Sequence, residues 1–443
     1  MRKSTALPIL AFFLPSLAGA QILPEPPSVD TLPNGLRLVT VRWPSPGIVA
    51  YFTLVRVGSR DEVEPGKSGF AHLFEHMMFR GTERYPSERY ERIIQEMGAD
   101  NNAFTTSDFT LYTVTTPGQS LPRLVELEAD RFAHLSYSEQ AFQTETRAVL
   151  GEYNKSASSP DLQMWEALSE LAFTRHTYGH TTMGYLRDIQ RMPGSYSFSV
   201  QFLRRYYTPD NCTIFAVGDV DRDELLRLVS ERYAGWTGRR DTPQIPLEPE
   251  QAEERSRHLS WQSATPPKIL MGYRVPPFST ANVDTAALRV LYELAFGPSS
   301  DLYQRLVVAE QKLLSLGENG MDLNRDPGLL VVDAELREGT RFDEITGAVT
   351  EELSRIAAGQ IPAARIEEVK SHVRYGMQLD LETPDDVAVL LAYYAAMDGD
   401  VLAVDRFMTQ LGEVGPADVA RVAREYLTPT RRTTVTLATG VTR

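Results

Sequence analysis

The sequence predicts two related halves that each combine β-strands with α-helices. The chain has 443 residues, which is too long for one hydrophobic core and indicates at least two domains. A repeat supports the division, because Arg205-Tyr206-Tyr207-Thr208-Pro209 is echoed 220 residues later by Glu425-Tyr426-Leu427-Thr428-Pro429. A strand-like segment follows each copy, so we expect a duplicated unit.

The domain boundaries are expected where the periodic pattern fades. The N-terminal domain is predicted at residues 21–240, a linker at 241–265 and the C-terminal domain at 266–443. The linker range contains several prolines and a charged cluster, which are typical of connecting segments.

The first twenty residues have the pattern of a signal peptide. Arg2 and Lys3 form a positive start, residues 7–17 are an apolar run, and Ala18-Gly19-Ala20 offers a small-residue cleavage site. The apolar run is shorter than a membrane span requires. We therefore expect an exported, periplasmic protein with no membrane span after cleavage.

The composition argues against two classes of function, nucleic-acid binding and cysteine chemistry. The chain is 42% hydrophobic with a net charge of −14, so its acidic surface argues against nucleic acid as a partner. Cys212 is the only cysteine. An intrachain disulfide is therefore impossible, and cysteine chemistry does not carry the function.

Local patterns predict the elements of the first half in order. Alternating or continuous apolar residues favour strands, whereas apolar residues three and four apart favour helices. Strands are expected at residues 36–41, 48–57, 101–106, 109–114 and 212–217, and helices at 68–79, 86–98, 121–134, 138–155 and 221–233.

The segment His72-Leu73-Phe74-Glu75-His76 carries the clearest chemical signal. On a helix, His72 and His76 lie four apart on one face, and Glu75 shares that face. Two neutral imidazoles at this spacing can hold a divalent metal, and the carboxylate beside them can take a proton from water. This is the H-x-x-E-H arrangement, the reverse of the commoner H-E-x-x-H.

The alternative is that two surface histidines fell at this spacing by chance. The neighbouring residues argue against it, because Leu73, Phe74, Met77, Met78 and Phe79 make the helix apolar on nearly all sides. Buried histidines beside a carboxylate need a partner for their charges and lone pairs. The pattern therefore favours a metal site.

The repeat offset also predicts which half can hold metal. Shifted by 220 residues, the three motif positions fall on Tyr292, Ala295 and Phe296. None of these offers a suitable ligand, so only the first half is expected to bind metal.

A catalytic zinc needs a third protein ligand, which spacing alone leaves open. Glu152 is a candidate because it lies on a predicted helix among apolar residues, seven positions after Glu145. Other candidates are the remaining histidines, which are more often surface or hydrogen-bonded residues. These are His134, His176, His180, His258 and His372.

These motifs resemble those of the insulinase/pitrilysin clan of zinc metallopeptidases. The similarity is greatest to the branch that contains mitochondrial processing peptidase and short bacterial relatives. It includes the H-x-x-E-H motif followed by Met-Met-Phe-x-Gly-Thr, and two glutamates seven apart at Glu145 and Glu152. The resemblance implies that His72, His76 and Glu152 bind zinc and that Glu75 is the general base. It implies that Glu145 supports activity without binding the resting metal.

Further matches extend the resemblance over the mature chain, at Asn102-Ala103-Phe104-Thr105 and at residues 206–211 and 217–219. The resemblance implies an α+β fold of two homologous two-layer halves. Each half would be a mostly antiparallel sheet covered by helices, and the halves would enclose a chamber. Substrate peptide would add as a strand beside Asn102, Ala103 and Phe104.

One segment departs from the family pattern. Active members carry, in the second half, an Arg and, seven residues later, a Tyr in a segment like Leu-Arg-Glu-x-x-Gly-Leu-x-Tyr. Gapless alignment with residues 302–314 puts Val307 and Leu314 at these positions. Neither can donate a hydrogen bond to a developing oxyanion.

The sequence is therefore interpreted as a zinc endopeptidase subunit that acts on peptides or unfolded polypeptides, with one zinc per chain. We expect a heterodimer with a related subunit that supplies the Arg/Tyr pair. The alternatives are a non-catalytic assembly subunit of the same family and a homodimeric peptidase without the pair. The ligand set would also accept cobalt or manganese.

Overall fold

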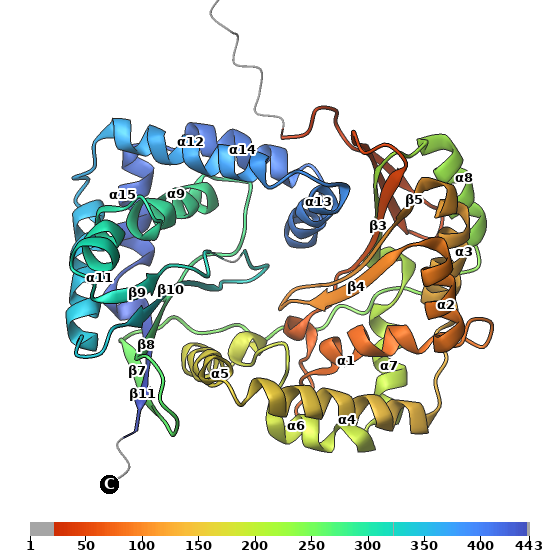
Figure 1. Cartoon of the computed structure of the whole chain (residues 1–443), viewed down its shortest axis with the longest axis horizontal. Helices are drawn as coiled ribbons and strands as arrows, with labels where there is room; N and C mark the ends of the chain where they lie inside the picture. The colour runs from red at the N-terminus through yellow and green to blue at the C-terminus, as the bar shows by residue number, and fades with distance from the viewer. Residues whose placement is uncertain (1–21, 322, 441–443) are drawn as a thin grey trace, which may run out of the picture.

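The computed structural model describes residues 22–321 and 323–440. Figure 1 shows two units side by side, one built around strands β1 to β6 and the other around β7 to β11. The fold class is confirmed, because each half is a mostly antiparallel sheet covered by helices. The predicted signal peptide, residues 1–20, lies outside the described residues.

The first sheet has the strand order β1-β2-β6-β3-β5-β4. Strands β2 and β6 are parallel, and the other neighbouring strands are antiparallel. The central strands β3 and β6 are buried along nearly their whole length, as their continuous apolar sequences predict. The bounds are β1 Ser28–Thr31, β2 Arg37–Arg42, β3 Ile48–Val55, β4 Asp100–Thr105, β5 Thr110–Pro117 and β6 Cys212–Gly218.

The second sheet repeats this order from β2 onward, as β7-β11-β8-β10-β9, and among the described residues it has no counterpart of β1. Its parallel pair, β7 and β11, matches β2 and β6, and its terminal strand β9 matches β4. The duplicated unit expected from the 220-residue repeat is therefore present in the strand order. The bounds are β7 Arg255–Trp261, β8 Lys268–Arg274, β9 Leu313–Leu316, β10 Leu329–Leu336 and β11 Arg432–Thr439.

Buried side chains on one face of the first sheet pack against helices of the first half, and those on the other face pack against the second half. One helix of the first half instead lies on the second sheet. Helix α5 contacts β7, β8 and β11 of the second sheet, and its Met164 and Leu168 are buried with Leu270 and Val435 there. The bounds are α1 Phe70–Met77, α2 Ser87–Met97, α3 Leu121–His134, α4 Glu139–Ser156, α5 Pro160–Ala172, α6 Leu186–Arg191, α7 Tyr196–Tyr206 and α8 Arg222–Arg232.

One helix of the second half packs on the sheet of the first half. Helix α13 contacts β3 and β6, and its Asp385 accepts a hydrogen bond from Thr115 of β5 at 2.7 Å. Each half therefore helps to cover the sheet of the other. The bounds are α9 Asp284–Phe296, α10 Asp301–Tyr303, α11 Phe342–Ala357, α12 Ala363–Leu379, α13 Pro384–Asp398, α14 Ala403–Glu413 and α15 Pro416–Tyr426.

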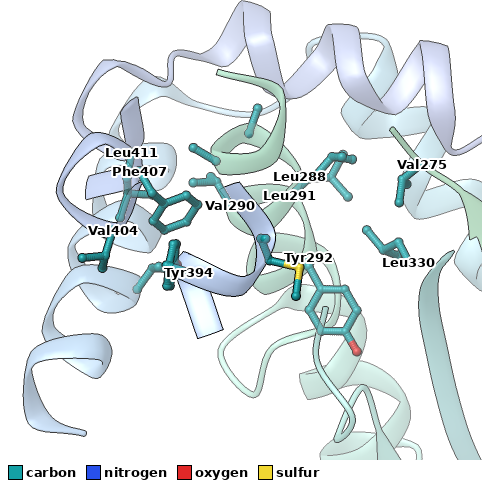
Figure 2. Close-up of a cluster of buried hydrophobic side chains, with 14 of the residues drawn as sticks. Val275, Leu288, Val290, Leu291, Tyr292, Leu330, Tyr394, Val404, Phe407 and Leu411 are labelled. Carbon is teal, nitrogen blue, oxygen red and sulfur yellow. The ribbon is translucent and has the colours of Figure 1, made fainter. Parts of the chain in front are cut away.

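Helix α9 is the second-half counterpart of α1 and lies in an apolar core. Figure 2 shows its Leu288, Leu291 and Tyr292 among side chains from α13, α14 and the second sheet. Tyr292, Ala295 and Phe296, which stand where α1 has its motif residues, are 3%, 0% and 0% exposed. This position is filled by core packing.

The predicted linker at residues 241–265 needs a correction. Residues 241–254 form neither helix nor strand, but β7 occupies Arg255–Trp261 and pairs with β11. The strand was missed because β7 lies at the edge of its sheet and alternates exposed polar residues with half-buried ones. Such a strand has little apolar periodicity.

Among the described residues, no single helix has the length and apolar composition to cross a membrane. Helices α13 and α14 together have that length and composition, but the chain bends by 85° between them.

Candidate metal centre

The motif residues lie on α1, a short helix held on several sides. Helix α1 contacts α4, α7, β4 and β5. Its apolar side chains Phe70, Leu73, Phe74 and Met77 are buried, and the ring of Phe74 stacks on Phe202 of α7 at 5.0 Å. This packing fixes which face of α1 turns toward α4.

The structure brings together the three residues expected to bind metal. His72 Nε2 lies 3.6 Å and His76 Nε2 lies 3.3 Å from Oε2 of Glu152 on α4. One donor atom from each residue can be chosen so that all three atoms lie within 4.8 Å of one another. The two imidazole rings are 4.9 Å apart and nearly perpendicular. Two nitrogens and one carboxylate oxygen therefore converge on one point.

The donor set suits a divalent metal such as zinc. Burial lowers the pKa of His72 to about 4, although the nearby Glu152 carboxylate raises it. A neutral imidazole has a free lone pair, which is the form that binds a metal. Two histidines and one carboxylate also leave a fourth coordination position open, as in catalytic zinc sites.

Glu75 lies beside these three residues and is oriented by a strand of the sheet. Its Oε2 accepts a hydrogen bond of 2.7 Å from the Thr105 hydroxyl at the end of β4. Burial raises the pKa of Glu75, and the hydrogen bond from Thr105 opposes that shift. A carboxylate with a raised pKa is suited to accept and return a proton near neutral pH.

A pocket of about 280 Å³ lies next to Glu75 and His76. Asn102 and Ala103 of β4, both predicted to contact substrate, line it as well. Phe104, the third predicted residue, is 36% exposed. Strand β4 is last in the sheet, so one of its edges has no partner strand among the described residues.

Glu145 lies behind His76, away from the point where the three donor atoms converge. Its Oε2 is 3.5 Å from His76 Nδ1, and its carboxylate forms an ion pair with Arg80. Glu145 is 4% exposed, so Arg80 provides charge compensation for a buried carboxylate. Arg80 was not predicted, although its position four residues after His76 was a signal that could have found it.

Val307 and Leu314, which stand where active family members have Arg and Tyr, lie in the second half. Val307 lies in the π-helical segment Gln304–Ala309 and packs partly against the core, whereas Leu314 of β9 is 42% exposed. The family segment has a glycine four residues after its Arg, and the residue at that position here, Gln311, has a φ of +51°. A left-handed backbone where glycine is expected supports the gapless alignment.

Known proteins resemble most of the chain. A family model described as insulinase (peptidase family M16) matches residues 38–185, and one described as the peptidase M16 inactive domain matches residues 199–373. The zinc protease PqqE of Helicobacter pylori is 28% identical in an alignment over 436 residues that covers 95% of this chain and 95% of that protein.

Solved structures share the fold. The crystal structure of a protease from Helicobacter pylori matches with a TM-score of 0.85 and 28% identity, covering 93% of this chain and 99% of that one. The first half of the periplasmic protease PqqL from Escherichia coli matches with a TM-score of 0.75 and 19% identity, covering 94% of this chain and 92% of that one. At that identity the likeness to PqqL concerns the fold alone.

Proposed function

Because the chain belongs to the insulinase family, peptidase family M16, we propose that it is a zinc-dependent endopeptidase subunit that hydrolyses peptides or unfolded polypeptides. The observation that carries the proposal is the convergence of His72, His76 and Glu152 beside a half-buried Glu75. Relatives named zinc proteases support zinc as the metal.

In this proposal His72, His76 and Glu152 hold zinc, one ion per chain. When bound there, zinc supplies Lewis-acid chemistry, which polarises a peptide carbonyl and lowers the pKa of water. Glu75 is the general base. Its carboxylate accepts the proton of the attacking water and passes it to the nitrogen of the leaving amine. The hydrogen bond from Thr105 holds the carboxylate in one orientation for both transfers.

The substrate is proposed to add as a strand to the free edge of β4. Main-chain groups along Asn102, Ala103 and Phe104 would pair with an extended peptide, a mode of binding that requires no particular sequence. Asn102 and Ala103 line the same pocket as Glu75 and His76, so a peptide paired there would run past the catalytic groups. Most main-chain groups of a folded protein are already paired, whereas those of an unfolded chain are free along its length, which is why unfolded substrates are proposed.

The active form is proposed to be a heterodimer with a related subunit that bears the Arg/Tyr pair. Val307 and Leu314 stand at the positions of that pair, and neither side chain carries a hydrogen-bond donor. The alternatives are a homodimeric peptidase that works without the pair and a non-catalytic assembly subunit. The complete donor set of His72, His76 and Glu152 argues against the second alternative.

We also propose that the protein is exported to the periplasm. The signal-peptide pattern of residues 1–20 supports this location.

The metal assignment predicts how zinc content responds to substitution. The purified protein is expected to contain about one zinc per chain, and His72→Ala or Glu152→Gln is expected to empty the site because each removes one of three ligands. Elemental analysis measures the content. His134→Ala is the matched control, since that histidine is exposed at the end of α3 and should leave zinc unchanged. Full zinc in either ligand variant would remove that residue from the set.

Glu145 is predicted to tune activity without binding the resting metal. Glu145→Gln replaces the charged carboxylate beside Arg80 and His76 Nδ1 with a neutral amide. Activity is therefore expected to fall about ten- to a hundredfold while zinc is retained. Peptide hydrolysis and zinc content measured on one preparation check this. Glu139→Gln, in the exposed first turn of the same helix, is the control. A crystal structure with Glu145 on zinc and Glu152 turned away would reverse the assignment.

A further inference from the structure

Helix α1 begins without a cap from its own first residue. Its N-cap is Gly69, with a φ of 87° and no side chain to accept a hydrogen bond. The first amides of any helix lack partners within the helix, and buried amides require an acceptor from elsewhere. Residues 70–74 are all buried, so water cannot meet that requirement along the helix.

The acceptor is Glu62, which lies several residues earlier in the chain. The Gly69 amide donates to its Oε2 at 2.7 Å, and the Ala71 amide donates to its Oε1 at 2.6 Å. The Glu62 side chain is fully buried, and the nearest imidazole nitrogen, Nε2 of His180, is 3.8 Å from Oε2. Both carboxyl oxygens are therefore engaged by the first turn of α1.

We propose that Glu62 is a positioning residue for the metal centre: it fixes the first turn of α1 so that His72 meets His76 and Glu152 at the metal. The inference rests on the proposed zinc site and adds to it a residue that contacts neither metal nor substrate. The Ala71 amide, which Glu62 binds, immediately precedes His72. A shift of this turn would move the His72 ring relative to Glu152, whose helix is separate.

Other contacts hold the chain before this turn but do not reach into it. Ser68 donates to Asp188 at 2.7 Å, and Gly69 packs against the loop at Gly184 so closely that a Cβ on Gly69 would lie 2.7 Å from the Met183 carbonyl oxygen. These contacts anchor residues 68 and 69. Glu62 in addition holds the amide of Ala71, the residue that precedes His72.

The geometry requires a carboxyl group rather than an amide. Two oxygens accept from two separate amides, whereas glutamine would present one oxygen and one NH₂ group. In Glu62→Gln, one backbone N–H would face another N–H in a buried site, so that amide could be satisfied only if the turn shifted. The substitution therefore tests the position of the turn with almost no change in side-chain volume.

The experiment measures zinc affinity by competition with a chromophoric chelator. Glu62→Gln is expected to bind zinc about ten- to a hundredfold more weakly than wild type, the range found when groups that orient ligands are removed. Glu248→Gln is the matched control, because its carboxylate accepts from the amides of Thr174, Arg175 and His176 in a loop without metal ligands. It should keep wild-type affinity even if it lowers the melting temperature.

The outcomes separate this inference from the proposed function. A wild-type protein without zinc would overturn the proposed function, whereas a zinc-binding wild type matched by a folded Glu62→Gln would overturn only the role of Glu62. If Glu62→Gln does not fold, Glu62→Asp is compared with Glu248→Asp. Aspartate keeps two oxygens but is one methylene shorter, so weaker zinc binding in Glu62→Asp alone supports the inference, and equal affinity in both overturns it.

Discussion

Replacing Glu75 with glutamine is expected to leave zinc bound and to lower the rate of peptide hydrolysis by at least about a hundredfold, the usual lower bound for a lost general base. Glutamine keeps the size of the side chain and can still accept the hydrogen bond from Thr105. It cannot accept the proton of an attacking water. Glu75 is absent from the group of converging donor atoms, so the metal should be unaffected.

The measurement is hydrolysis of a fluorogenic peptide alongside zinc content in the same preparation. Glu91→Gln is a suitable control, because Glu91 lines the same pocket but is exposed on α2, so its variant should keep its activity. Near-normal hydrolysis by zinc-loaded Glu75→Gln would refute the mechanism. A loss of zinc in that variant would instead make Glu75 part of the metal site.

The parts of the site that the sequence predicted are those set by local geometry. His72, Glu75 and His76 share a helix face because of their spacing, and any helix there would bring them together. Glu152 is different. Its distance from His72 depends on how α4 packs against α1, and helical spacing contains no information on that contact. Only the family resemblance singled it out.

The residues that sequence reasoning missed serve the site through tertiary contacts. Thr105 reaches Glu75 from a strand, and Glu62 reaches the start of α1 from a turn several residues earlier. Each is an ordinary polar residue in the sequence, and its role follows from burial and from its partner. Such roles depend on the folded arrangement of several elements.

The fold shows the same division between local and long-range information. The 220-residue repeat predicted two related halves, and the strand orders agree with it. Local periodicity could not predict that α5 packs on the second sheet or that α13 packs on the first. An apolar helix face indicates that it is buried, but not against which sheet.

A related subunit that bears the Arg/Tyr pair is expected to raise the activity of this chain by about a hundred- to a thousandfold, the effect of one oxyanion donor. Attack on a peptide carbonyl builds negative charge on its oxygen, and Val307 and Leu314 cannot donate to it. Gln311 has a left-handed backbone and stands at the glycine position of the family segment. This supports the alignment that places Val307 and Leu314 at the Arg and Tyr positions.

The expectation can be tested both between subunits and within one chain. Activity and particle size are measured for the chain alone and after mixing with an Arg/Tyr-bearing relative. In the chain itself, Val307→Arg with Leu314→Tyr should raise the rate. Val308→Arg with Leu314→Phe should not, because it moves the guanidinium one residue along the helical segment to an exposed position, and phenylalanine has no hydroxyl donor. The contrary result is a wild-type chain that is fully active alone, with a rate that neither the relative nor the double substitution changes. That result would show that polarisation by zinc suffices without those donors and that the heterodimer is unnecessary.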